Sequence, residues 1–267
     1  MSVILKEAGA LQYFAAEGIK VPHCFTTRLG GVSTGALASM NIGTSRGDSR
    51  ENVLKNYEIL GAALGFDPHR AVLSRQTHSD IVRVVTEAQA GAGLYEEHLS
   101  DCDALITSAK GLALVIFTAD CTPILFWDPE TGAVGAAHAG WRGTAQAIAA
   151  KTVEAMEKNF GSQPRNIRAA IGPNIGACHF ETNGDVPEAM RKAFGTQADP
   201  FITRSGDKFF LDLKAINAVV LRNAGVSHIE ISDACTYCQP ELFWSHRITG
   251  QNRGSQGAVI VCGEACK

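Results

Sequence analysis

The chain has 267 residues, 45% of them hydrophobic, and a formal net charge of −3 at pH 7. This composition supports a full hydrophobic core, and the length corresponds to one large or two small domains. There is no dense run of Lys and Arg, which argues against a nucleic acid or an anionic membrane as the partner. No stretch approaches the roughly 20 apolar residues that span a bilayer. We therefore expect a cytoplasmic protein that acts on a small molecule.

The first half of the chain predicts one helix and several strands. Residues 49–64 form a helix in which Val53, Tyr57, Leu60 and Leu64 share one face, and Gly65 ends it. Strands are expected at residues 71–76, 81–85, 104–107, 112–117 and 133–137. The segment between the first two of these strands places His78 at a strand end.

The second half mixes the same elements. Thr144 is the expected N-cap of a helix that ends at Phe160, and Asp212 that of a helix that stops at Gly225. Further strands are expected at residues 228–232 and 258–261. There is no internal repeat and no long linker, so we expect one domain over residues 1–267. Because strands and helices interleave, with hairpins as well as crossovers, the predicted fold is a layered α/β domain with mixed sheets flanked by helices.

A predicted hairpin brings two metal-ligand residue types together. The turn Asp128-Pro129-Glu130-Thr131-Gly132 lies between two apolar runs. A turn centred near Glu130 puts Cys121 roughly opposite His138, where the Cβ atoms of cross-strand neighbours lie about 4.5–5.5 Å apart. Pro123 is expected to cause a bulge or a strand break. A cysteine and a histidine meeting across strands suggest a metal site.

The remaining cysteines give a weaker signal. With eight cysteines and no secretory signal, we expect thiols, not disulfides. Cys235 and Cys238 could form a four-thiolate zinc ribbon with Cys262 and Cys266, but the second spacing is a poor match to known zinc knuckles. Cys24, Cys102 and Cys178 are most simply interpreted as small buried residues.

Motifs along nearly the whole chain, from about residue 26 to 260, resemble a known family. They are QTHS, TADCTPIL, AAHAGWRG, TTRLGGVSTG, SMNIGTSRGD, DALIT, IGPNIG and FWSHR. The chain resembles the multicopper polyphenol oxidase or laccase-like family, whose bacterial members are also called peptidoglycan editing factor and are now interpreted as zinc-dependent purine nucleoside enzymes.

The resemblance implies a metal site and an activity. The family's metal ligands fall on His78, Cys121 and His138, which would be both the metal-binding and the catalytic residues. Two imidazoles and one thiolate leave a fourth tetrahedral position open, as in a catalytic zinc site. Phosphorolysis of adenosine, inosine and methylthioadenosine and deamination of adenosine are the implied reactions, with a purine nucleoside and phosphate as partners. Copper can occupy the same donors because it binds nitrogen and sulfur more tightly than zinc does.

Phosphorolysis needs an anion site, and several residues are candidates for it. Gly140 to Gly143 lead into the helix that is expected from Thr144, so its N-terminus and Arg142 could bind phosphate. Arg28 and Arg247 are further candidates because a guanidinium binds an oxyanion with two hydrogen bonds. For each arginine, a surface charge or a structural bond to a carbonyl explains the residue equally well.

Neutral and acidic residues complete the candidate site. Asn41 and Gln76 could contact a purine edge or a ribose hydroxyl, although turn and strand-end roles explain them almost as well. Asp103 and Asp120 could each orient a ligand or accept a proton. Strand alternation sends Asp120 to the face opposite Cys121.

The chain departs from the family pattern at a few positions, and other classes of function are also consistent with its sequence. Asn56-Tyr57, Asn174 and Arg247-Ile248 stand where relatives often carry Asn-Arg, Cys and paired arginines. The main alternative is a copper-dependent polyphenol oxidase, although none of the eight histidines forms the His-x-His pair of a multicopper site. Cys121 could instead be the nucleophile of a cysteine hydrolase, activated by His138. A binding protein for peptidoglycan precursor quality control is the non-catalytic alternative.

Overall fold

The computed structural model describes residues 2–263, and its centre is a pair of six-stranded mixed sheets. In spatial order the first sheet consists of β1 (Val3–Ala8), β2 (Leu11–Ala16), β3 (His23–Thr26), β15 (Gln256–Val261), β7 (Ala113–Thr118) and β4 (Ala71–Leu73). The second consists of β14 (His228–Ile231), β10 (Arg168–Ile171), β8 (Thr122–Trp127), β9 (Val134–Ala139), β6 (Ala104–Thr107) and β5 (Val82–Val84). Most neighbours run antiparallel, whereas β4 pairs parallel to β7, β5 to β6 and β14 to β10. The predicted mixed α/β class is therefore confirmed.

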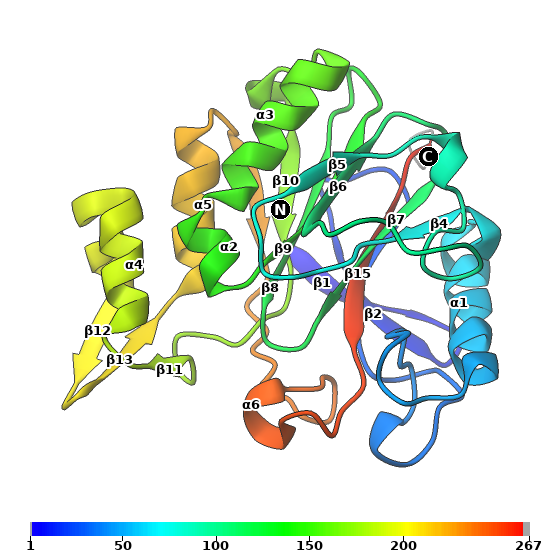
Figure 1. Cartoon of the computed structure of the whole chain (residues 1–267), viewed down its shortest axis with the longest axis horizontal. Helices are drawn as coiled ribbons and strands as arrows, with labels where there is room; N and C mark the ends of the chain where they lie inside the picture. Colours follow the sequence, from blue (N-terminus) through cyan, green and yellow to red (C-terminus); the bar gives the residue numbers. More distant parts are fainter. Residues whose placement is uncertain (1, 264–267) are drawn as a thin grey trace.

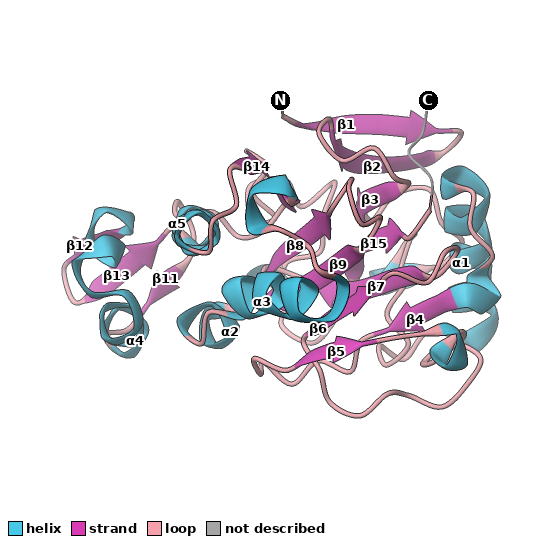
Figure 2. Cartoon of the chain, turned by 90° about the horizontal axis from the view of Figure 1, so that it is seen from above, coloured by secondary structure: helices cyan, strands magenta, loops and turns pink. Residues whose placement is uncertain are grey.

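The two sheets pack face to face and helices cover their outer faces. Leu114 of β7 and Ile260 of β15 lie in one buried cluster with Leu125 of β8 and Ala136 of β9. On the outer face of the first sheet lies α1 (Arg50–Leu64). On that of the second lie α3 (Ile148–Phe160) and α5 (Leu213–Asn223). The layers are thus helix, sheet, sheet and helix, with α1 and α3 on opposite sides (Figures 1 and 2).

A small unit extends this body at the end far from α1. It consists of α4 (Asp185–Phe194) and a three-stranded sheet of β11 (Glu181–Thr182), β13 (Lys208–Leu211) and β12 (Ile202–Ser205). Its own buried cluster also takes up Trp141 of the short helix α2 (Trp141–Ala145). The short helix α6 (His246–Thr249) precedes β15 (Figure 1).

The helix over residues 49–64 is confirmed almost to the residue. The hydroxyl of Ser49 caps α1 by accepting from the N–H of Asn52, and Gly65 ends the helix in the left-handed conformation. Val53, Tyr57, Leu60 and Leu64 are all buried, as predicted. Asp212 likewise caps α5, which ends at Asn223, two residues before Gly225.

The helix that was expected to start at Thr144 begins earlier and is broken. Gly140 is the N-cap of α2, and Ala147 then adopts a left-handed φ of 58° before α3 begins. The hydroxyl of Thr144 accepts a hydrogen bond from Asn217 of α5 and so does not cap a helix. The expected cap was therefore wrong, because a tertiary contact uses the side chain that the sequence offered for capping.

The β8–β9 hairpin forms without the bulge predicted at Pro123. Pro123 pairs with His138 in an unbroken register, and Thr122 pairs with Ala139. Cys121 therefore lies just before β8 and not opposite His138, so the predicted register was wrong by two residues. The backbone N–H of His138 donates to Asp103 on the β6 side, while Pro123 accepts from Gly172 on the opposite side. The ladder between β8 and β9 thus needs no N–H from Pro123.

The sequence located six other strands at nearly their observed positions and missed several. β4 to β7, β14 and β15 lie within about a residue or two of the predicted ranges, except that the strand predicted over residues 71–76 ends at Leu73. β1, β2, β3, β10 and the small sheet were not predicted. Among residues 2–263, no helix combines the length and the apolar character that crossing a bilayer requires.

Candidate metal centre and pocket

Three donor side chains converge at the open end of the β8–β9 hairpin. His138 is the fifth residue of β9, Cys121 directly precedes β8, and His78 lies in the loop between β4 and β5. Their ligand atoms all lie within 4.8 Å of one another. The Sγ of Cys121 is 3.9 Å from the Nε2 of His78, and the two imidazoles meet edge to face at 5.0 Å between ring centroids. The structure thus brings together the cysteine and both histidines that the sequence singled out.

The carboxylate of Asp103 holds two of these side chains in place. It is fully buried and accepts from the Nδ1 of His138 at 2.7 Å, which leaves Nε2 of that imidazole as the remaining donor. It also accepts from the backbone N–H groups of Thr77, His78 and Ser79 and from the hydroxyl of Ser79. One carboxylate therefore fixes both the ring of His138 and the loop that carries His78. The structure gives Asp103 the ligand-orienting contact considered from the sequence.

The charges in this group favour a thiolate beside an imidazolium. Burial by itself raises the pKa of Cys121, but the charge and hydrogen bond of His138, followed by those of His78, outweigh it and lower the pKa to about 6. Burial opposes protonation of His138, yet Cys121 and Asp103 raise its pKa to about 9. Burial also opposes ionisation of Asp103, but the hydrogen bond and charge of His138 and the bonds from Ser79 lower its pKa to about 2. The thiolate is the form in which cysteine binds metals.

The backbone around the centre is tightly constrained. His78 and Asp120 both have positive φ, 60° and 85°, which non-glycine residues rarely adopt. A Cβ on Gly140 would lie 2.9 Å from Cδ2 of His78 and 3.2 Å from the Sγ of Cys121. Only glycine at position 140 leaves both side chains where they are.

Asp120, the residue before Cys121, bonds to a segment more than 100 residues later in the chain. Its carboxylate accepts from the hydroxyls of Thr236 and Ser245, at 2.6 and 3.0 Å, and from the backbone N–H of Arg247 at 2.7 Å. Asp120 thereby fixes the segment of residues 236–247 beside the centre. Asp120 does not belong to the cluster of three donors, as the expected alternation predicted.

The three donor residues line a pocket of about 360 Å³. This volume is within the range of small-molecule sites. Residues 43–46 and the segment before β15, including Ser255, form other parts of its wall. Three arginines line it as well, Arg46, Arg75 and Arg253.

Arg253 and Arg46 concentrate positive charge in this pocket. Arg253 is only 7% exposed, and its Nε has no hydrogen-bond partner among the described residues. Burial, followed by repulsion from Arg46, lowers its pKa to about 10, which leaves the guanidinium charged at neutral pH. A buried, charged and partly unpaired donor calls for an anion.

Sequence reasoning missed these arginines. Arg46 stands in the motif SMNIGTSRGD, but nothing in the sequence placed Arg253 near Cys121.

Asn41 and Gln76 support the pocket wall through backbone contacts. The Oδ1 of Asn41 accepts from the N–H groups of Gly43 and Ser255, and its own side chain is fully buried. Gln76 lines the pocket, and its amide exchanges two hydrogen bonds with the backbone of Phe117. Both amides therefore already have protein partners.

The arginines singled out from the sequence lie outside the lining of this pocket. Arg28 donates to the carbonyls of Ala38 and Pro240. Arg142 is exposed and lies 4.2 Å over the ring of its neighbour, Trp141. Arg247 donates to the carbonyl of His179 and to that of Glu181, the first residue of β11. In this structure, the contacts of Arg28 and Arg247 are those of structural donors.

Comparison with known proteins identifies the family and agrees with the fold. Residues 22–263 match the family model described as multi-copper polyphenol oxidoreductase laccase. A purine nucleoside phosphorylase of Deinococcus radiodurans is 40% identical over 95% of this chain and 94% of its own length. Adenosine deaminase RL5, from an unknown prokaryotic organism, is 36% identical over 90% of this chain and 93% of its own. The crystal structure of YlmD from Geobacillus stearothermophilus superposes with a TM-score of 0.92 at 34% identity, covering 99% of this chain and 100% of that one. The chain therefore belongs to the multi-copper polyphenol oxidoreductase laccase family.

Proposed function

We propose that this protein is a zinc-dependent purine nucleoside enzyme that phosphorolyses adenosine, inosine and methylthioadenosine and deaminates adenosine. The observation that carries the proposal is a cluster of three donors, His78, Cys121 and His138, exposed to a pocket that also holds buried arginine charge. The names of the relatives, purine nucleoside phosphorylase and adenosine deaminase, support the same substrate class.

The donor set fits a catalytic zinc. Zinc accepts imidazole nitrogen and thiolate sulfur, and catalytic sites keep three protein ligands and one open position. The hydrogen bond from the Nδ1 of His138 to Asp103 is the outer contact typical of a metal-binding histidine. When bound, zinc would act as a Lewis acid and lower the pKa of water.

The chain's own residues account for substrate binding and charge. Asp103 keeps the ring of His138 in one tautomer and orientation. Arg46 and Arg253 would bind phosphate, because their guanidinium groups line the pocket that the donors share. The nucleoside would lie between this anion site and the donors, so that both the ribose C1′ and the purine C6 are within the pocket.

The two reactions differ in the bond that breaks. In phosphorolysis a phosphate oxygen bonds to C1′ as the bond from C1′ to the purine nitrogen breaks, and the base leaves with a proton. In deamination the oxygen of water replaces the amino group at C6, which leaves as ammonia. Arg46 and Arg253 would serve the first reaction and are not needed for the second.

The experiment is turnover of adenosine with and without phosphate by protein of measured zinc content. We expect free base and ribose 1-phosphate only when phosphate is present, and inosine in both cases. His78→Ala and His138→Ala should lose both activities, whereas His228→Ala, at an exposed position on β14, should keep them. Absence of turnover by the zinc-loaded protein, or full activity of His138→Ala, would exclude the proposal.

We also propose that the protein acts in the cytoplasm. All seven cysteines within residues 2–263 are free, and the arrangement of Cys121 depends on its remaining reduced. A reducing compartment suits such a chain.

A further inference from the structure

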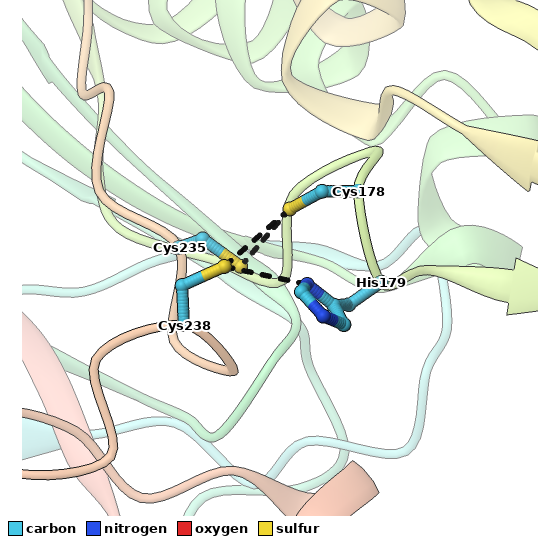
Figure 3. A group of neighbouring side chains, drawn as sticks. All are labelled: Cys178, His179, Cys235 and Cys238. Carbon is cyan, nitrogen blue, oxygen red and sulfur yellow. Dashed lines mark hydrogen bonds between the residues drawn. The ribbon is translucent and has the colours of Figure 1, made fainter.

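A second cluster of donors lies outside the pocket, where two neighbouring strands end. β10 and β14 run parallel, so the loops after them leave the sheet at the same edge. A backbone bridge between Asn174 and Cys235 holds the two loops together. One loop carries Cys178 and His179 and the other carries Cys235 and Cys238, and all four side chains point to a common centre (Figure 3).

The distances in this cluster are those of a tetrahedral metal site. The Sγ of Cys178 lies 3.7 Å from that of Cys235 and 3.6 Å from that of Cys238, and Nδ1 of His179 lies 3.3 Å from the Sγ of Cys238. With Zn–S bonds of about 2.3 Å and Zn–N bonds of about 2.0–2.1 Å, a tetrahedron has edges of about 3.8 Å between sulfurs and about 3.5 Å from sulfur to nitrogen. The four ligand atoms lie within 4.8 Å of one another.

The backbone is arranged to support a thiolate at Cys235. The N–H of Gly176 donates to its Sγ at 3.2 Å, and the amides of Tyr237 and Cys238 also form hydrogen bonds with it. Such bonds are available because Cys235 and Cys238 are separated by two residues, the spacing common in zinc knuckles. The ring of His179 stacks on that of Tyr237, with centroids 4.0 Å apart, which fixes the direction of Nδ1.

We propose that Cys178, His179, Cys235 and Cys238 bind a structural zinc ion, separate from the His78, Cys121 and His138 centre. Three thiolates and one imidazole complete a four-coordinate shell, which leaves no open position for substrate. None of the four residues lines the pocket of the first centre.

This site replaces the ribbon considered from the sequence. Cys262 is buried and its thiol donates to the carbonyl of Gly132, while Cys266 lies outside the described residues. Cys24 and Cys102 are buried as expected, but Cys178 is exposed, so its interpretation as a core residue was wrong. Its two cysteine partners are distant in sequence, and only the pairing of β10 with β14 brings them near.

The ion would stiffen one side of the first centre. The second loop continues from Cys235 to Thr236, whose hydroxyl bonds to Asp120 next to Cys121. On the first loop, the side chain of Asn174 donates to the hydroxyl of Thr122. Zinc between the two loops would hold both of these contacts in register with β8.

Metal analysis of the purified full-length chain tests the proposal. The wild type should carry about two zinc ions per chain, and Cys238→Ser and Cys178→Ser about one. His78→Ala should also carry about one, but it should keep the ion that the cysteine variants lose. Cys262→Ser is the matched control and should keep about two, because a hydroxyl can also donate to Gly132.

Cobalt substitution identifies the ligands independently of activity. In His78→Ala, the remaining cobalt should show the charge-transfer absorption of several thiolates, and Cys238→Ser should weaken it. Cys238→Ser should also unfold at a lower temperature than the wild type. Removing zinc from the wild type with a chelator should lower its unfolding temperature as well. One zinc ion per wild-type chain, lost in His78→Ala and kept in Cys238→Ser, would overturn the proposal.

If the serine variants do not fold, alkylation of the wild type replaces them. Cys178 and Cys238 are exposed. They should resist a thiol reagent until a chelator is added and then react. Reaction at the same rate with and without the chelator, or a disulfide between Cys178 and either partner in the isolated protein, would contradict the assignment.

Discussion

The carboxylate of Asp103, on the residue before β6, accepts a hydrogen bond of 2.7 Å from His138 of the neighbouring strand β9. Around it, four further donors from the loop of residues 77–79 use the same two oxygens. The centre therefore depends on one buried negative charge that joins two ligands from different parts of the chain.

Replacing Asp103 with Asn should weaken metal binding without removing a ligand. An amide presents one acceptor oxygen and an NH₂ group that cannot accept, so the loop bonds and the bond from His138 cannot all be kept. We expect zinc affinity to fall by about 10- to 100-fold, the usual effect of losing such a contact. Competition with a chromophoric chelator measures it, and Asp207→Asn, in an exposed turn, should match the wild type. An unchanged affinity would contradict the role of Asp103.

Alkylation of Cys121 should depend on both metal and pH. Because its folded pKa is about 6, metal-free protein holds the reactive thiolate above that pH, and the rate should level off near neutrality. Below pH 6 the rate should fall roughly tenfold per pH unit, because the thiolate fraction does so. Zinc should protect the residue, as peptide mass spectrometry can measure. Equal labelling with and without zinc would favour a free nucleophile, as in a cysteine hydrolase.

Gly140→Ala should disturb the first centre while the fold remains. Its added Cβ would lie 2.9 Å from the ring of His78 and must displace it. We expect loss of one zinc ion per chain and of turnover, with nearly unchanged circular dichroism. Gly184→Ala is the control, since the nearest atom to its Cβ, on Phe209, lies 3.9 Å away. Normal zinc content in Gly140→Ala would show that the ligands can move apart without loss of the site.

Arg253→Met should separate phosphorolysis from deamination. A hydrogen bond to a charged group contributes about 1.5–3 kcal/mol, so KM for phosphate should rise by about 10- to 100-fold while adenosine deamination changes little. Arg46→Met should act in the same direction. Steady-state kinetics at varied phosphate provide the measurement.

Arg142→Met is the informative comparison for that experiment. Arg142 lies over Trp141, outside the pocket lining, so its replacement should leave the phosphate KM unchanged. A larger effect at Arg142 than at Arg253 would instead support the anion site that the sequence suggested at residues 140–143 and the start of the helix that follows them.

The local parts of the fold could be predicted because their signals lie within a few residues. The apolar spacing of α1 and its caps, Ser49 and Gly65, define that helix without help from elsewhere. The turn at residues 128–132 likewise defines the β8–β9 hairpin, and with it the proximity of Cys121 and His138. The bulge predicted at Pro123 does not form. Whether a strand needs the N–H that proline lacks depends on which side of the residue faces a neighbouring strand, and the sequence does not show this.

The helix near Thr144 shows where local signals compete with distant ones. Thr144 is a good cap by residue type, yet its hydroxyl is bonded to Asn217, 73 residues away, and the helix starts at Trp141 instead. Arg28 and Arg247 are similar, because an arginine suited to an oxyanion is equally suited to backbone carbonyls, and only the folded chain decides between them.

The sequence by itself determined the layered α/β class, the first long helix and the hairpin that brings a thiol near an imidazole, because each depends on periodicity or on a turn between adjacent segments. Only the tertiary structure decided which arginines enter the pocket, which carboxylate orients His138, and that Cys178 and His179 meet Cys235 and Cys238. Those contacts join segments that are in some cases more than 200 residues apart. The pairing of strands in the sheets brings these segments together, and no local pattern in the sequence encodes that pairing.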